Sequence, residues 1–357
     1  MSHYYLNLQI KIVFGILFLF PLFFSCGKEE TSGKYTDGVF IANEGGFESN
    51  NGSVSFYSYN ADSVYNDIFF DVNHRSLGDV VQSVTIHDGK VYIVVNNSNK
   101  IEIADRQTFK ENGVITGLSS PRYLAAFEKM AFVSCWGDNT VKIINLETNS
   151  IVESIPVGAG PDKMCIVNNK LYVANTGGWA TDSLISVIDI ATYELIKNIS
   201  VKYSPYDMVI DNENNIWALC YGKVIYDTED PYPIIEESPS KIYKIDTESD
   251  EPVLEIVLFD DQHPWHLEIS NDGELFFGGG YSFQGIYHLA IESEDVTRTQ
   301  IISDYVYGFN IDPGTNIFFI MLAPTFTEPG MLKRYSKEGE LLGTYDCGIG
   351  PKSAAFK

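Results

Sequence analysis

The stretch that decides the fold is "KLYVANTGGWATDSLISVIDI", residues 170–190. Residues 170–175 and 184–190 both place apolar side chains at alternating positions, and a loop containing Gly177, Gly178 and Trp179 separates them. Alternation of this kind is typical of β-strands with one buried face, so the stretch predicts a hairpin. Trp179 falls at its tip, where the hairpin offers no core of its own. The role of this side chain therefore depends on how often the pattern recurs.

The first strand of this hairpin recurs along the chain. Seven segments carry an aromatic residue at one fixed place, and successive aromatics are 40 to 59 residues apart. A loop and a second strand follow each of them. The seven residues are Phe40, Tyr92, Phe132, Tyr172, Trp217, Phe276 and Phe318. A repeat of this length indicates a propeller or a solenoid, and we expect the seven aromatics to pack between repeats and not to form a site.

A proline marks the strand that precedes most of these aromatics, so the repeat has four strands. These prolines are Pro121, Pro161, Pro205, Pro264 and Pro351. The last copy, "GPKSAAFK", ends the chain with no aromatic strand after it, while the first aromatic strand, "GVFIAN", has no proline copy before it. We therefore expect the C-terminal strand to join the first blade and close the ring. The predicted fold is all-β, a seven-bladed β-propeller with four-stranded blades over residues 36–357.

The N-terminal residues indicate export. An apolar run after Lys11 ends at Ser25 and Cys26, and it is too short for a secure membrane span. "LFFSC" resembles a bacterial lipobox, and "GKEE" resembles the acidic export signal of Bacteroidetes surface lipoproteins. We expect a lipoprotein signal peptide over 1–25, a linker lipidated at Cys26 over 26–35, and a place on the outer membrane facing the cell surface. The alternatives are an uncleaved anchor helix and an ordinary charged linker.

Composition restricts the partners and the redox chemistry. The net charge of −24 argues against nucleic-acid binding and against anionic membranes, so only the lipid anchor is expected to contact a membrane. The mature cysteines show no CxxC spacing, which supports neither a zinc site nor a redox motif. They are Cys135, Cys165, Cys220 and Cys347. Their even number permits disulfides, but their apolar strand contexts favour buried free thiols.

One face of the predicted propeller is rich in aromatic residues. It carries the loops between the second and third strands and the connections between blades, whereas the turns on the other face are short and polar. Clustered exposed aromatics usually mark an interaction site, although each ring alone could pack on a neighbour. We expect Arg122 and Lys352 to be available for polar or phosphate groups. The candidate ligand-binding residues are Phe47, Arg122, Trp136, Trp179, Tyr206, Tyr221, Trp265, Tyr281, Phe283, Tyr307, Phe326 and Lys352.

Catalytic chemistry has little support in the sequence. No GxSxG, HExxH, EF-hand or P-loop motif is present, so we expect no catalytic residue, no metal site and no enzyme activity. His263 and His266 lie at a blade corner, where they either form ordinary hydrogen bonds or ligate a metal ion, which includes a metal inside a bound cofactor. The long loop over residues 221–240 is either a partial lid over the aromatic face or an excursion into solvent.

Several segments resemble a known family. "KLYVANTGG", "SVIDIATYELIKNISV" and "PVGAGPDKM" are similar to the repeats of YncE-like propellers, and the resemblance extends over residues 36–357. Together with the lipobox, it points to the Bacteroidetes surface-lipoprotein branch that includes the vitamin B12-capturing BtuG group. The resemblance implies a seven-bladed propeller with a lipid anchor, and we expect no resident cofactor. It also implies a nutrient ligand, a corrinoid such as cobalamin, and a TonB-dependent outer-membrane transporter as partner.

Three other functions stay open from the sequence. A glycan- or peptide-binding propeller in an uptake system would use the same aromatic rim, because aromatic rings also stack on sugars. A protein-interaction scaffold would use the same face. A lactonase- or lyase-like enzyme would instead need metal ligands at the axial channel, and the sequence shows no such set.

Overall fold

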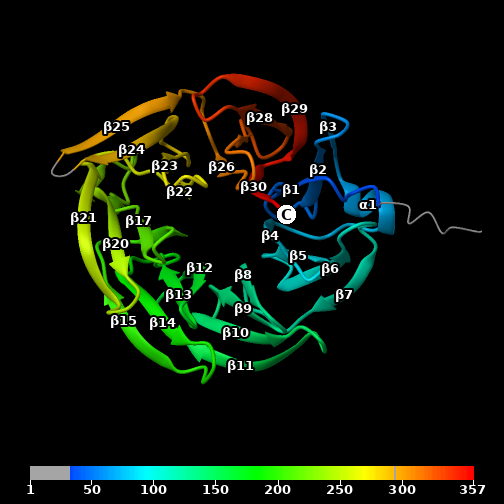
Figure 1. Ribbon diagram of the computed structural model, residues 1–357, viewed down its shortest axis with the longest axis horizontal. Helices are drawn as coiled ribbons and strands as arrows, with labels where there is room; N and C mark the ends of the chain where they lie inside the picture. The colour runs from blue at the N-terminus through cyan, green and yellow to red at the C-terminus, as the bar shows by residue number, and fades with distance from the viewer. Residues whose placement is uncertain (1–32, 293–294) are drawn as a thin grey trace, which may run out of the picture. The chain divides into compact units, whose positions relative to one another are not determined.

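The computed structural model describes residues 33–292 and 295–357. Residues 33–357 form one compact unit, a ring of seven four-stranded antiparallel sheets with the first strand of each blade nearest the centre (Figure 1). This confirms the predicted fold. The expected signal peptide and Cys26 lie outside the described residues. Within the described part, no helix is long and apolar enough to cross a membrane.

The blades follow the predicted repeat, and the strands of each blade are named in order from the channel outward. Blade 1 contains β30 (Pro351–Ala355), β1 (Gly38–Asn43), β2 (Ser53–Ser58) and β3 (Ser63–Tyr65). Blade 2 contains β4 (Val81–His87), β5 (Lys90–Val95), β6 (Lys100–Asp105) and β7 (Glu111–Ile115). Blade 3 contains β8 (Pro121–Phe127), β9 (Met130–Cys135), β10 (Thr140–Asn145) and β11 (Ser150–Pro156). Blade 4 contains β12 (Pro161–Val167), β13 (Lys170–Asn175), β14 (Leu184–Asp189) and β15 (Leu195–Ser200).

The second half of the ring has one insertion. Blade 5 contains β16 (Pro205–Ile210), β17 (Ile216–Cys220), β20 (Ser240–Asp246) and β21 (Glu251–Phe259). The insertion is a separate hairpin of β18 (Lys223–Tyr226) and β19 (Ile234–Ser238). Blade 6 contains β22 (His266–Ile269), β23 (Leu275–Gly278), β24 (Ile286–Glu292) and β25 (Asp295–Ile302). Blade 7 contains β26 (Gly308–Ile311), β27 (Phe318–Leu322), β28 (Pro329–Tyr335) and β29 (Leu341–Ile349).

The ring closes as the sequence predicts. The C-terminal strand β30 pairs antiparallel with β1, with Ile41 opposite Ala354 and Phe40 opposite Ala355. Blade 1 therefore combines the two ends of the folded unit. Closure gives blade 1 its innermost strand, so all seven blades have four strands and their inner edges face the central channel.

The seven repeated aromatics lie in the cores between blades, as predicted. Each is at most 7% exposed. Every seam between neighbouring blades holds one cluster of buried side chains, such as the cluster that joins Phe276 of blade 6 to Phe318 of blade 7. Burial of seven such clusters is the main source of stability, because apolar burial dominates the free energy of folding.

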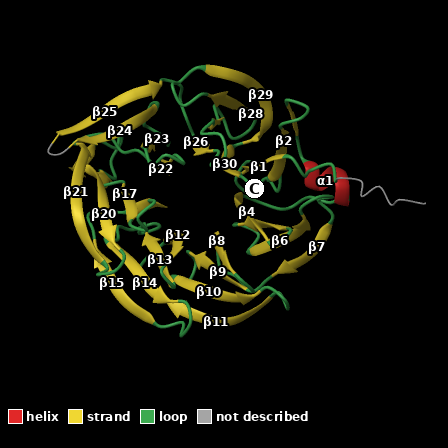
Figure 2. Cartoon of the chain, in the orientation of Figure 1, coloured by secondary structure: helices red, strands yellow, loops and turns green. Residues whose placement is uncertain are grey.

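The folded part begins earlier than the predicted boundary at residue 36. Tyr35 is 2% exposed, and its ring centroid lies 5.3 Å from that of Phe56 and 5.8 Å from that of Phe109. The expected linker therefore ends at a packed aromatic anchor. A short helix, α1 (Ile68–Asn73), packs beside blade 1 and buries Ile68 and Phe69; it is the red element in Figure 2.

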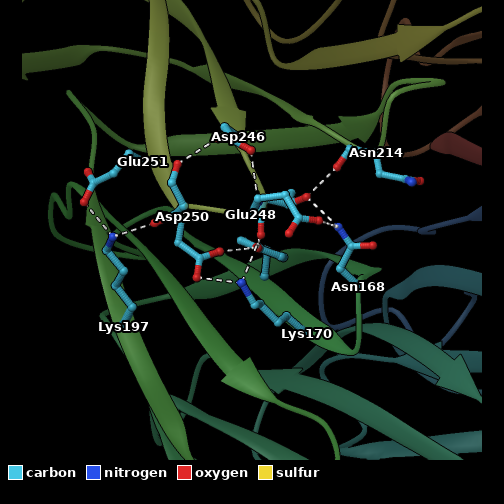
Figure 3. Close-up of polar contacts among 11 residues, drawn as sticks. Asn168, Lys170, Lys197, Asn214, Asp246, Glu248, Asp250 and Glu251 are labelled. Carbon is cyan, nitrogen blue, oxygen red and sulfur yellow. Dashed lines mark hydrogen bonds and ion pairs between the residues drawn. The ribbon is translucent and has the colours of Figure 1, made fainter.

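Polar contacts reinforce the seam between blades 4 and 5 on the face of the short turns (Figure 3). Lys170 Nζ lies 2.8 Å from Asp250 Oδ2, and Lys197 Nζ lies 2.6 Å from Glu251 Oε1. The two pairs differ in burial, because the Asp250 side chain is 12% exposed and that of Glu251 is 62% exposed. The inner pair is therefore expected to contribute more to stability.

The cysteines at positions 135, 165, 220 and 347 are free thiols, as the sequence favours. Three are buried and Cys165 is half-buried. Burial raises the pKa of the Cys347 thiol to about 11, so this thiol stays protonated and unreactive at neutral pH.

Candidate functional site

The candidate face is built by residues at the start of the innermost strands or directly before them. In each blade one side chain, directly after the proline or its equivalent, stands at the mouth of the central channel. We call this set the mouth ring. It consists of Gln82, Arg122, Asp162, Tyr206, Trp265, Tyr307 and Lys352. Blades 5 to 7 contribute the three aromatic residues and the other blades the four polar ones, so the mouth is divided into two halves.

The aromatic half extends outward through the neighbouring loops. The rings of Tyr206 and Trp265 stack, with centroids 5.4 Å apart and planes 28° apart. Tyr281 and Phe326 also stack, at 5.9 Å and 22°. Edge and tilted contacts connect these pairs, so the rings form one continuous surface, which we call the aromatic arc. Its members are Tyr206, Tyr221, Trp265, Tyr281, Tyr307 and Phe326.

A glycine lets the arc pack closely. Gly280 has φ +111°, and a Cβ placed there would lie 2.6 Å from Cγ of Trp265. Only glycine accommodates both this backbone conformation and the indole against the chain. The segment "GGY" before the loop tip thus positions Trp265 beside Tyr281.

A cavity of about 480 Å³ opens between blades 6 and 7 at the end of the arc. Tyr281, Tyr307 and Phe326, all expected from the sequence, contribute to its wall. The sequence reasoning missed the other wall residues: Gly280, Tyr305, Val306, Leu322, Ala323, Pro324 and Met331. The signal for Tyr305 was available, because "YVY" places it two residues before Tyr307 at the same corner. The cavity has the size and the predominantly apolar wall of a small-molecule site.

The polar half of the mouth is internally neutralised. Arg122 donates to Gln82 Oε1 at 2.6 Å and pairs with Asp162 Oδ2 at 3.2 Å. Lys352 Nζ lies 2.7 Å from Glu44 Oε1. The expectation that Arg122 and Lys352 are free for phosphate is therefore wrong, since each cation already faces a buried carboxylate.

Glu44 contacts both halves of the mouth ring, Lys352 on the polar side and Tyr307 on the aromatic side. Its second oxygen accepts a hydrogen bond from the Tyr307 hydroxyl at 2.6 Å. Burial alone would raise the pKa of Glu44, but the charge and hydrogen bond of Lys352 and the hydrogen bond of Tyr307 outweigh it and lower that pKa. Glu44 is thus ionised at neutral pH. Sequence reasoning missed this residue, which follows β1 directly.

The two loop tryptophans of blades 3 and 4 meet at the rim. The guanidinium of Arg122 lies 4.0 Å from the ring centroid of Trp136, and Trp179 meets Trp136 edge-on at 6.1 Å. Trp179 is 98% exposed. Its place at the rim agrees with the prediction, and its indole is free to contact a binding partner.

Two predicted residues stand apart from this surface. Phe283 is 1% exposed and packs against Phe259, Phe277 and Tyr287 in the core between blades 5 and 6, so its assignment to the ligand site is wrong. Its loop turns this apolar ring under the blade because burial is more favourable than exposure. Phe47 is 70% exposed and pairs with no aromatic ring among the described residues.

The two corner histidines form ordinary hydrogen bonds. His263 contacts the carbonyl oxygen of Tyr221 at 2.5 Å and Oε1 of Glu237 at 2.9 Å. His266 contacts the carbonyl oxygen of Tyr307 at 3.1 Å. Among the residues that the structure describes, no group of three or more His, Cys, Asp or Glu side chains is arranged to hold a metal ion.

The insertion of blade 5 is an ordered hairpin, since β18 pairs antiparallel with β19. The contact between Glu237 and His263 ties its base to the corner before β22. Its tip exposes Tyr232, Ile234 and Ile235. Whether it acts as a lid stays a prediction.

Comparison with known proteins agrees with this architecture. Residues 37–322 match a family described as a domain of unknown function (DUF5074). The chain belongs to this family. No curated protein matches this DUF5074 propeller.

Solved structures share the fold at low sequence identity. A quinonprotein alcohol dehydrogenase-like protein from Bacteroides thetaiotaomicron aligns with a TM-score of 0.68 and 16% identity, covering 90% of this chain and 78% of that one. A protein from Bacteroides uniformis, provisionally assigned as a 6-phosphogluconolactonase, aligns with a TM-score of 0.64 and 12% identity. The alignment covers 89% of this chain and 99% of that one. Kuenenia stuttgartiensis hydrazine synthase aligns with a TM-score of 0.62 and 16% identity, and the alignment covers 76% of this chain and 88% of that one. These likenesses support the fold only.

Proposed function

We propose that this DUF5074 propeller is a non-enzymatic surface lipoprotein that captures a nutrient for a TonB-dependent outer-membrane transporter. The proposed nutrient is a corrinoid such as cobalamin. The observation that carries the proposal is the aromatic arc, which runs from Tyr221 to Phe326 beside a cavity of about 480 Å³. A scaffold for weak protein contacts would not need such a concave aromatic wall.

The arc suits a broad, flat ligand. The rings of Tyr206 and Trp265 lie nearly parallel at the channel mouth, and Tyr281 and Phe326 lie nearly parallel beside the cavity. Rings arranged in this way bury large apolar area with few rotatable bonds, and the hydroxyl groups of tyrosine orient polar substituents. A corrin macrocycle presents a flat conjugated face of this kind.

The polar half favours neutral hydrogen-bonding groups over phosphate. Because Asp162 and Glu44 compensate Arg122 and Lys352, an added anion would be close to two buried carboxylates. This half contains both donors and acceptors, which suits a carboxamide with its N–H donors and carbonyl acceptor. Carboxamides surround the corrin ring of cobalamin, so the same ligand suits both the aromatic and the polar half of the mouth.

The closed ring supports tight capture. Its seven blades are joined by buried clusters, and the mouth residues lie in the innermost strands or directly before them. A rigid site loses little conformational freedom on binding, which improves affinity. The proposed lipid on Cys26 would keep such a site next to the transporter.

The proposal is tested by isothermal titration of the protein spanning residues 33–357 with cyanocobalamin and with cobinamide, a corrinoid without the nucleotide loop. We expect one-to-one binding of both. Absence of heat for every corrinoid at micromolar concentration would refute corrinoid capture.

A glycan is the second candidate ligand, and the exposure of Trp179 favours it. An indole that is 98% exposed at a rim is typical of stacking on sugars. Binding to a glycan array without corrinoid binding would select this function. Turnover of a lactone or an alcohol substrate would select an enzyme instead.

A further inference from the structure

A second ring of side chains lines the channel below the mouth ring. It comes from the next residue of each innermost strand and comprises Ser83, Tyr123, Lys163, Asp207, His266, Gly308 and Ser353. Blades 7, 1 and 2 contribute only small residues to it. The space that they leave is a cavity of about 190 Å³, lined by Lys163, Tyr123, Ser83, Thr85, Asn310 and Ser353 among others.

The ammonium group of Lys163 lies between the Asp207 carboxylate and the ring of Tyr123, whose centroid is 4.9 Å from Nζ. Its nearest carboxylate oxygen, Oδ1 of Asp207, is 3.5 Å away, and Lys163 Nζ donates no hydrogen bond within residues 33–292 and 295–357. Asp207 itself accepts from the backbone N–H groups of Met208 and Leu267 at 2.9 and 3.2 Å. Lys163 therefore faces the cavity with N–H donors to spare.

Hydroxyl groups line the same cavity. Ser83 and Thr85 donate to the carbonyl oxygens of Arg122 and Leu124 at 2.8 and 3.0 Å, so their hydrogens are already used. The side-chain hydroxyls of Tyr123 and Ser353 make no hydrogen bond within the described part of the chain. Because Ser83 and Thr85 have used their hydrogens, the donors left for an anion are the N–H groups of Lys163 and the hydroxyls of Tyr123 and Ser353.

The other acid near Lys163 adds little negative charge. Burial raises the pKa of Glu268 to about 8, although Lys163 and a 2.6 Å hydrogen bond from Asn310 oppose the shift. Glu268 is therefore mostly protonated at neutral pH. Asp207 then offsets Lys163, and an anion entering the cavity meets no excess of negative charge at close range.

We propose that this cavity is a binding site for a small monovalent anion, a halide or a small carboxylate, held by Lys163 with the hydroxyls of Tyr123 and Ser353. The site is separate from the aromatic arc, because its lining shares no residue with the arc. Its small volume excludes a corrinoid. The anion would give Lys163 Nζ an acceptor in addition to Oδ1 of Asp207, which lies 3.5 Å away.

Bromide is the probe that tests this site. Crystals of the protein spanning residues 33–357 are soaked in sodium bromide, and anomalous scattering locates the ion. We expect a peak in contact with Lys163 Nζ inside the channel. Peaks confined to surface lysines would show an adventitious ion only and would overturn the proposal, as would no peak at all.

Binding in solution gives the second readout. The protein should broaden the bromide NMR line, and acetate should reduce this broadening by displacing bromide. The broadening should fall at least tenfold in Lys163→Met. Tyr123→Phe and Ser353→Ala keep the charge beside Asp207, so they fold even if Lys163→Met does not, and each should weaken binding severalfold. Lys129→Met, at an exposed pair with Glu147, is the matched control and should change nothing. Equal broadening by all variants would overturn the proposal.

Discussion

Lys352 and Glu44, which are 308 residues apart in sequence, form a buried ion pair at the channel mouth, with Nζ 2.7 Å from Oε1. Lys352 belongs to β30, the last strand, and Glu44 follows β1, the first. The pair therefore closes the ring electrostatically where β1 and β30 close it by backbone pairing. Tyr307 joins the pair to the aromatic arc through its hydroxyl.

Breaking this pair should destabilise the ring. Lys352→Met leaves the Glu44 carboxylate buried without its cation, and loss of one partner of a buried pair costs about 3–5 kcal/mol of unfolding free energy. Urea denaturation of the soluble protein measures the loss. The double variant Lys352→Met/Glu44→Gln removes both charges and should recover most of it. Identical urea midpoints for wild type and Lys352→Met would contradict the role of the pair.

The seam between blades 4 and 5 offers an internal comparison of two neighbouring acids (Figure 3). Asp250 accepts hydrogen bonds from Lys170 and from the buried Tyr172, so Asp250→Asn should cost about 1–3 kcal/mol of unfolding free energy. Glu251→Gln is the matched control, since its pair with Lys197 is largely solvated and should cost under about 1 kcal/mol. Equal losses of unfolding free energy in the two variants would show that burial does not make the Asp250 pair more stabilising than the Glu251 pair.

Glu268 should make stability depend on pH. Its pKa is raised from 4.5 to about 8 in the fold, so between these values the native state holds a proton that the unfolded chain has lost. The stabilisation is complete below pH 4.5 and is lost as the pH rises through 8. Melting curves from about pH 5 to about pH 9 should show the wild type falling relative to Glu268→Gln, which keeps a neutral side chain. Parallel curves would contradict the shifted pKa.

Tyr281 and Phe283 lie two residues apart in one loop but should have opposite roles. Phe283→Ala removes a core ring and should cost about 3–5 kcal/mol of stability, with little change in ligand affinity. Tyr281 is 64% exposed, so Tyr281→Ala should weaken ligand binding and leave the melting temperature almost unchanged. Titration and thermal denaturation of both variants check the pair. A loss of affinity in Phe283→Ala at a temperature where it is fully folded would place Phe283 in the ligand site after all.

Local patterns predicted the fold because each blade repeats the same pattern of strands and buried residues. An aromatic on the second strand recurs with every blade and a proline at the start of the first strand with most of them, and the unmatched copies at the two ends predicted closure through β30. Tyr35 escaped prediction because a single aromatic in a polar tether carries no periodicity. It is anchored by Phe56 and Phe109, which are distant in sequence.

The site was predictable only as a face of the molecule. Residue type and loop position located Tyr206, Trp265 and Tyr307, which the structure brings together. They could not separate Phe283 from Tyr281, because both are loop aromatics and only tertiary packing decides which is buried. They also could not show that Lys352 pairs with Glu44, because the two residues come together only when β30 pairs with β1. The second ring with Lys163 was visible in "PDKM" as the residue two positions after a proline, but no chemical motif marked it.

The most direct test of the central claim is an equilibrium titration of cyanocobalamin into wild type, Trp265→Ala and Trp179→Ala. Trp265 stacks at the centre of the arc, so its truncation should raise Kd at least about tenfold, while the rim residue Trp179 should have a smaller effect. Tight one-to-one binding that weakens in this order would support corrinoid capture on the aromatic arc. No binding by wild type, or binding that Trp265→Ala leaves unchanged, would contradict it.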